Sequence, residues 1–163
     1  MTTFAGKLME PVLLQIRSIL QTNLPTMIAT INTEHESETD AFALENPLQY
    51  YIGQLQVVNQ VPAIVLWPIG DASAEWSNDT ILFKPRITIW AAITDTDEER
   101  LNRKMYRMQD AIIRTLKNTD DLEGQVDFYD IVGVDFRSPW PIADASFCNA
   151  HGVVIEVNHE ETV

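Results

Sequence analysis

Cys148 and His151 are the first residues whose types suggest chemistry, because an imidazole base beside a thiol can activate it as a nucleophile. The two residues lie three positions apart in the run 147–158, which is expected to form a strand. Residues three apart on a strand point to opposite faces of the sheet. We therefore expect that the pair does not react together, and that Cys148 is a buried or half-buried strand thiol.

His35 is the second candidate, because it lies among glutamates in the stretch 34–38 and this composition could hold a divalent ion. The spacing matches no metal motif, and a loop loses conformational entropy when it coordinates an ion. The acids of 120–130 surround Gly124 as in a calcium loop, but the glycine placement and the closing glutamate do not align with one. No metal and no cofactor is expected.

Composition excludes several classes of function. The motifs GxGxxG, GxxxxGK[ST], GxSxG, HExxH and CxxC are absent from the sequence. The 163 residues include 24 Asp plus Glu against 11 Lys plus Arg, a net charge of −13, which is the wrong sign for holding a phosphate backbone. No apolar run approaches the roughly 18 residues of a membrane span, so no membrane partner is expected. An enzyme is not expected, although any two carboxylates could meet in space as an acid and a base.

Cations and aromatic residues stand out instead. Most of the basic residues lie within 100–117, and at about 100° per residue they occupy the side of a helix opposite its apolar stripe. Aromatic side chains often dominate binding interfaces. A solvated helix face and an aromatic core are the alternative interpretations. The candidate interface residues are Arg100, Arg103, Lys104, Arg107, Arg114, Trp76, Trp90 and Tyr106.

One long helix is expected to carry these cations, over residues 97–118. Thr96 and Glu99 have the spacing of a capping box, and acids follow at the positions that the helix dipole favours. The apolar stripe is expected to pack against Ile87, Ile89 and Ala91 of a strand. The stripe consists of Leu101, Met105, Met108, Ile112 and Leu116.

Two further helices are expected at the N-terminus. Apolar residues recur with a helical period over 4–20, and Pro25 ends this helix and begins a short second one. Pro85 requires a sheet edge or a bulge at its position. The segment 34–46 carries acids without any basic residue, which predicts a mobile loop. β-branched and aromatic runs predict strands at 49–52, 62–67, 81–93, 130–136 and 147–158.

The predicted fold class is therefore α+β. It has a single mixed or antiparallel sheet of about five strands, one long amphipathic helix packed on the sheet, and two N-terminal helices. Residues 1–163 form one domain, with 34–46 as its flexible acidic loop.

The order of the elements resembles that of a known family. The chain has a leading helix, then the strand VPAIVLW (61–67), a loop with Trp76, the long strand ILFKPRITIWAAI, the helix ERLNRKMYRMQDAIIRTL (99–116), YDIVGVDFR and the final strand HGVVIEV. Together these resemble the tail terminator (tail completion or neck) proteins of long-tailed bacteriophages. The resemblance covers most of the chain from Val61 to Val157. The N-terminal helices and acidic loop look longer than the family's minimal version, which leaves open a related neck or head-completion role.

The resemblance implies a structural virion protein without catalytic residues. Such a subunit closes into a six-membered ring at the head-proximal end of the tail tube, stops tail polymerisation and joins the tail to the head. The implied partners are further copies of the chain, the tail tube protein, a head–tail connector or neck protein, and the sheath protein if the tail is contractile. Genomic DNA passes through without specific binding. The implied location is the virion, and the host cytoplasm during assembly.

Charge placement independently suggests association of copies. The basic helix face and the acid-rich segment 118–163, whose single base is Arg137, would complement each other between subunits in a heterologous contact that can close into a ring. Three alternatives stay open. They are an acidic binding module such as an antitoxin or DNA mimic, a connector or head-completion protein, and a small enzyme with an unrecognised carboxylate pair.

Overall fold

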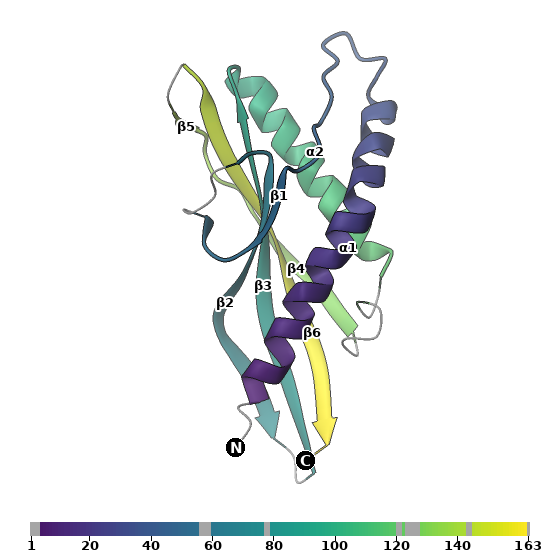
Figure 1. Ribbon diagram of the computed structural model, residues 1–163, viewed down its shortest axis with the longest axis vertical. Helices are drawn as coiled ribbons and strands as arrows, with labels where there is room; N and C mark the ends of the chain where they lie inside the picture. Colours follow the sequence, from purple (N-terminus) through teal and green to yellow (C-terminus); the bar gives the residue numbers. More distant parts are fainter. Residues whose placement is uncertain are drawn as a thin grey trace.

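The computed structural model describes residues 4–55, 60–76, 79–119, 122, 128–142 and 145–162. Within them the chain is α+β, with two helices and one mixed sheet of six strands (Figure 1). The strands run in the order β1-β2-β3-β6-β4, and β5 pairs with β6. The β1–β2 pair is parallel and the other pairs are antiparallel. The elements are α1 (Phe4–Glu34), β1 (Gln49–Ile52), β2 (Ala63–Trp76), β3 (Thr80–Asp95), α2 (Glu98–Lys117), β4 (Phe128–Asp135), β5 (Trp140–Pro141) and β6 (Phe147–Thr162).

The prediction of two N-terminal helices is wrong, because α1 is one continuous helix with Pro11 and Pro25 inside it. Proline removes one backbone hydrogen bond and crowds the preceding turn, at a cost of about 3 kcal/mol. Leu24 and Ile28, on either side of Pro25, are both buried in the main core. Burial of this continuous apolar side offsets the cost of the proline, so the helix passes through it.

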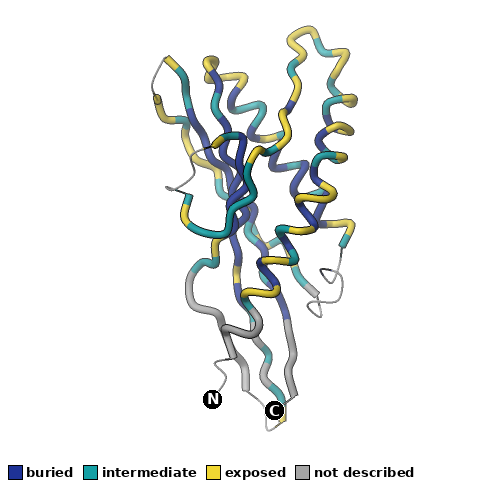
Figure 2. The backbone as a smooth tube through the Cα atoms, in the orientation of Figure 1, coloured by how far each residue is buried: buried dark blue, intermediate teal, exposed yellow. Residues whose placement is uncertain are grey.

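Both helices cover one face of the sheet, here called the helix face. The predicted stripe of α2 lies in one core cluster with Ile87, Ile89 and Ala91 of β3, which confirms the predicted packing. The side chain of α1 residue Ile16 is also fully buried in this cluster. Figure 2 shows buried residues along the middle of the strands and exposed ones on the outer sides of the helices.

The start of α2 differs from its predicted capping box. Asp97 is the N-cap, with extended backbone, and its carboxylate accepts a hydrogen bond of 2.8 Å from the backbone N–H of Arg100. A short carboxylate at this position satisfies one of the N–H groups that lack an intrahelical partner. Thr96 and Glu99 are therefore not the capping pair, although the helix itself occurs where it was predicted.

Pro85 lies in a central strand at an irregularity in the pairing. β3 pairs with β2 on one side and with β6 on the other, so Pro85 is not at a sheet edge. Ile69 pairs with Arg86 and Ser73 pairs with Lys84, so the register between β2 and β3 shifts opposite Pro85. The predicted bulge is confirmed, because proline offers no N–H to a regular ladder.

Candidate functional site

Three surfaces contain the residues that could contact a partner. The first is the side of α2 that carries its cations, here called the arginine face (Arg100, Arg103, Lys104, Arg107 and Arg114). Glu38 of the acidic loop lies between two of these residues, with an Oε2 that is 3.0 Å from Arg103 Nη2 and 2.6 Å from Arg107 Nη2. Both guanidinium groups also lie over the ring of Phe42, at 5.0 and 4.1 Å from its centroid. The loop thus supplies both a carboxylate and an aromatic ring to α2.

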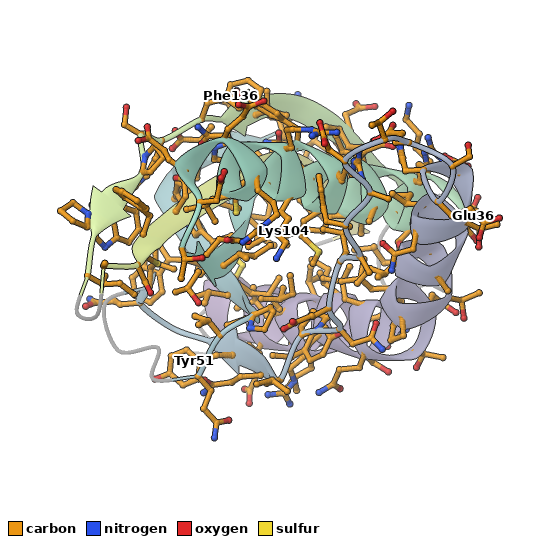
Figure 3. The ribbon with its side chains drawn as sticks, turned by 90° about the horizontal axis from the view of Figure 1, so that it is seen from above. Glu36, Tyr51, Lys104 and Phe136 are labelled. Atoms are coloured by element: carbon orange, nitrogen blue, oxygen red, sulfur yellow. The ribbon has the colours of Figure 1, made fainter. Side chains whose placement is uncertain are left out.

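Asp95 joins the end of β3 to the arginine face. Its carboxylate is 3% exposed and lies 2.5 Å from Arg100 Nη2 and 2.8 Å from Lys104 Nζ. The hydrogen bond from Arg100, and after it that from Lys104, holds the pKa of Asp95 well below its usual range. Figure 3 shows Lys104 directed from α2 toward the interior of the molecule. This cluster fixes the turn from strand to helix.

The remaining cation of the arginine face, Arg114, pairs with Glu34 at 2.9 Å and with Asp110 at 2.9 Å. Each of the five predicted interface cations therefore has a carboxylate partner in its own chain. The acidic loop and Asp95 therefore compensate the basic patch in part, because Glu38 and Asp95 are each shared by two cations. A role of this face in contact with a neighbouring subunit stays a prediction.

The acidic loop is also anchored beyond Glu38. The Asn32 side chain donates to the carbonyl of Leu44 at 3.0 Å and accepts from its N–H at 2.7 Å. Leu44 is buried in the main core. The Glu38 carboxylate accepts from His35 and Arg107, which lowers its pKa. Mobility of the segment 34–46 stays a prediction. The contacts of Glu38, Phe42 and Leu44 restrain the segment.

The second surface lies where α2 meets the outer strand β4, and we call it the edge patch (Tyr106, Val132, Val134 and Phe136). Their exposed fractions are 54%, 46%, 43% and 56%. The rings of Tyr106 and Phe136 meet edge to face at a centroid distance of 5.8 Å. No strand among the described residues pairs with the outer edge of β4. The edge patch is therefore apolar and adjoins unpaired backbone.

His151 lies beneath the edge patch. Its ring is 5.4 Å from that of Tyr106 and 5.2 Å from that of Phe136, and the residue is buried. Burial lowers the pKa of His151, so the imidazole is neutral at pH 7. Nearby, the Gln109 side chain donates to the carbonyl of Gly152 at 2.9 Å, which ties α2 to β6. The edge patch thus rests on a buried and uncharged imidazole ring.

The third surface is on the other face of the sheet, which the helices do not cover. Trp90 is nearly buried there and lies against Gly152 of the next strand, where an added Cβ would be 3.2 Å from the indole ring. The guanidinium carbon of Arg137 lies 4.2 Å from the centroid of this ring. Beside them is a hollow of about 310 Å³, which we call the tryptophan hollow. It is lined by Gln54, Leu55, Trp67, Ile69, Trp90 and Arg137.

The aromatic residues predicted for an interface are separated by this fold. Tyr106 is in the edge patch and Trp90 forms the floor of the tryptophan hollow. Trp76 pairs with Ile81 through the backbone at the end of β2, and its side chain lies outside the described part of the structure. Sequence reasoning missed Phe136 as a surface residue, and it did not select Arg137. The available signal for Arg137 was its isolation as a base within an acidic segment.

Neither the hypothesis of a cysteine nucleophile nor that of a metal site corresponds to a cluster of suitable side chains in the described residues. His151 is on the helix face, whereas Cys148 pairs with Trp140 on the opposite one, as the strand period predicts. Burial raises the pKa of the Cys148 thiol. No group of three His, Cys, Asp or Glu side chains is placed to hold a metal within the described ranges. Of the acids in 120–130, all but Asp130 lie outside those ranges.

No helix in the described part of the chain is both long and apolar enough to cross a membrane. No protein-family model matches this chain, and no curated protein matches its sequence.

Proposed function

We propose that this chain is a structural subunit of the tail of a long-tailed bacteriophage, which assembles with further copies into a ring at the head-proximal end of the tail tube. There it ends tube polymerisation and joins the tail to the neck. The observation that carries the proposal is the edge patch, an exposed apolar surface on an open strand edge. The element order behind the family resemblance is also present, including a leading helix, although Trp76 ends β2 instead of lying in a loop.

The edge patch is best explained by a partner that covers it. An open strand edge with exposed apolar side chains promotes association, and monomeric proteins usually protect such edges with charge or cover. Val132 and Val134 are exposed on β4, Phe136 is exposed just after the end of that strand, and Tyr106 extends the apolar area onto α2. Burial of this area between subunits would stabilise an assembly, because apolar surface leaves water.

The placement of the sheet edges supports head-to-tail association. β1 and β4 are the two ends of the strand order, and Tyr51 and Phe136 lie on opposite sides of the molecule in Figure 3. A contact between two unlike surfaces is heterologous, and it closes into a ring when the rotation between subunits allows. A net charge of −13 suits a ring through which DNA passes, since acids repel phosphates within the ~8 Å screening length of physiological salt.

The test is an assembly measurement followed by a functional one. The mass of the purified chain is measured by light scattering across protein concentrations, and particles are imaged in negative stain. Tube protein of the same phage is then polymerised with and without the chain, and tube lengths are compared. We expect ring-shaped particles and shorter tubes that carry a particle at one end.

A pair of variants links this result to the edge patch. Val134→Lys places a charge in the apolar area and should reduce both assembly and capping of tubes. Leu14→Lys makes the same kind of change at a side chain of similar exposure on α1 and should leave both unchanged. A chain that stays monomeric with and without tube protein contradicts the proposal. A monomer or dimer that binds a basic protein would favour the acidic binding module instead.

A further inference from the structure

We infer that the tryptophan hollow receives a carboxylate-bearing side chain from a second copy of this chain. The inference rests on the proposed ring of identical subunits and names one of the two surfaces that meet in it. The hollow is on the sheet face that the helices leave uncovered, between the segment after β1 and the segment after β4. Its charged group and its apolar walls identify the kind of group that fits.

Arg137 provides the charged group. It is exposed, its guanidinium lies over the Trp90 ring, and within the described residues it forms no ion pair with a carboxylate. Arg86, on the same face of the sheet, pairs with Glu156 at 2.9 Å, and each cation of the arginine face also contacts a carboxylate. Stacking on an aromatic ring leaves the N–H groups in the guanidinium plane available to a carboxylate. Arg137 is thus a cation held in place by an aromatic ring, and no carboxylate of the described segments pairs with it.

The walls of the hollow select what accompanies the carboxylate. Trp67 is 40% exposed, and Leu55 and Ile69 complete an apolar rim. No lining residue is acidic. A volume of about 310 Å³ is at the small end of ligand pockets, which suits a protein side chain with an apolar stem better than a large ligand.

Charge identifies a second copy as the occupant. Each chain carries −13, so two copies repel each other wherever their acids face one another. The tryptophan hollow combines an apolar surface with a cation that has no carboxylate partner in the described part of the chain, and a second copy offers 24 acids. A two-fold contact centred on the hollow would bring two Arg137 side chains together, which is unfavourable. The hollow must therefore meet a different surface of the second copy, as a ring requires.

The first experiment identifies the occupant directly. Trp67 is replaced by the photo-crosslinking residue p-benzoylphenylalanine in the full chain, and isotopically heavy and light chains are mixed before irradiation. Mass spectrometry then separates crosslinks between chains from those within one chain. We expect heavy–light crosslinks from position 67, and none from the same residue placed at Leu14 of α1. Assembled chains that crosslink at position 67 only within themselves, or not at all, overturn the inference.

The second experiment tests the charge. Arg137→Glu should raise the protein concentration needed for half-maximal assembly by about tenfold or more, the effect of losing a central interface contact. Arg137→Lys keeps the charge and should have a smaller effect. Arg86→Gln is the matched control, because it removes an exposed arginine of the same sheet face that already has its own partner. The melting temperature of each variant, measured on the dissociated chain, checks that folding is intact.

The outcomes separate the two proposals. If the wild-type chain forms rings and Arg137→Glu forms them equally well, the tryptophan hollow is not the interface, while the ring remains. If the wild-type chain is monomeric under every condition, the proposed function and this inference both fail. If Arg86→Gln weakens assembly as much as Arg137→Glu, net charge rather than the hollow controls association, and the inference fails alone.

Discussion

Two arginines of this molecule stack on aromatic rings, but only one of them also pairs with a carboxylate in the described residues. Arg107 lies over Phe42 at 4.1 Å and is also paired with Glu38, so it has a carboxylate partner inside the subunit. Arg137 lies over Trp90 at 4.2 Å and has no carboxylate partner among the described residues. The first arginine belongs to the basic stripe that the sequence displays most clearly. The second is an isolated base in an acidic segment.

The contrast shows that a conspicuous run of charge does not locate an interface. The stripe on α2 attracts acids, and the nearest acids belong to the loop that the same chain folds against it. A cation is available to another molecule only where the fold supplies no acid of its own. The isolated base is therefore the better candidate for contact between subunits.

The largest expected loss of stability comes from a charge placed in the core between α2 and the sheet. Met108→Asp places a carboxylate in the fully buried stripe of α2, which should cost several kcal/mol of a total stability of 5–15 kcal/mol and unfold the chain. Tyr106→Asp makes the same kind of change at an exposed position of the same helix and should leave the fold intact. Circular dichroism during heating measures both. A normal melting curve for Met108→Asp would refute the packing of α2 on the sheet.

An intermediate effect is expected for the buried end of the arginine face. Asp95→Ala leaves Lys104 and Arg100 without their shared carboxylate, and should lower the free energy of unfolding by about 3 kcal/mol in urea titrations at pH 7. Glu156→Gln breaks a more exposed pair with Arg86 and should cost only about 0–1 kcal/mol. Equal losses for the two variants would show that Asp95 has no special role.

The pH dependence of stability gives a second test of the role of Asp95. The pKa of Asp95 is lowered in the folded chain, so its contribution is fully present above the unfolded value of about 4 and is lost as the pH falls below it. The stability difference between the wild type and Asp95→Ala should therefore be constant near neutral pH and shrink in acid. A difference that grows as the pH falls would contradict this assignment.

The smallest expected change in stability comes from variants that compare the surroundings of Arg107 and Arg137. Glu38→Gln should lower the urea midpoint, because Arg103 and Arg107 lose a carboxylate that they share within the chain. Arg137→Gln, measured on the dissociated chain, should change the free energy of unfolding by no more than about 1 kcal/mol, the size of an exposed stacking contact. If Arg137→Gln destabilises the chain as much as Glu38→Gln does, the contrast between the two arginines is lost.

The regular elements were largely predictable from the sequence because they depend on local period. The stripe of α2 and the alternation of Ile87 and Ile89 on β3 both follow the positions that the fold buries. The continuity of α1 was not predictable, since it depends on how much apolar surface lies on each side of Pro25 in the folded chain. The two-residue strand β5 is too short to leave a periodic signal.

The candidate surfaces depended on contacts far apart in the sequence. Glu38 reaches α2 from 65 residues away, so no local pattern could show that the arginine face is occupied. Trp90 and Tyr106 were selected together as aromatic residues, but Trp90 lies on the sheet face away from the helices, whereas Tyr106 lies on α2 over the other face. Arg137 reaches Trp90 across the intervening strand β6.

The tryptophan hollow also has a signature that could be sought in other sequences. Gly152 has no positive φ, so its backbone does not require glycine; the position lacks space, because a Cβ there would meet Thr88 Cγ2 at 2.7 Å and the Trp90 ring at 3.2 Å. A chain with this arrangement needs a tryptophan in β3 and a glycine opposite it in β6. It also needs a basic residue just after β4, the strand that precedes β6 in the sequence. These three positions give a search pattern for homologues that pairwise identity would miss.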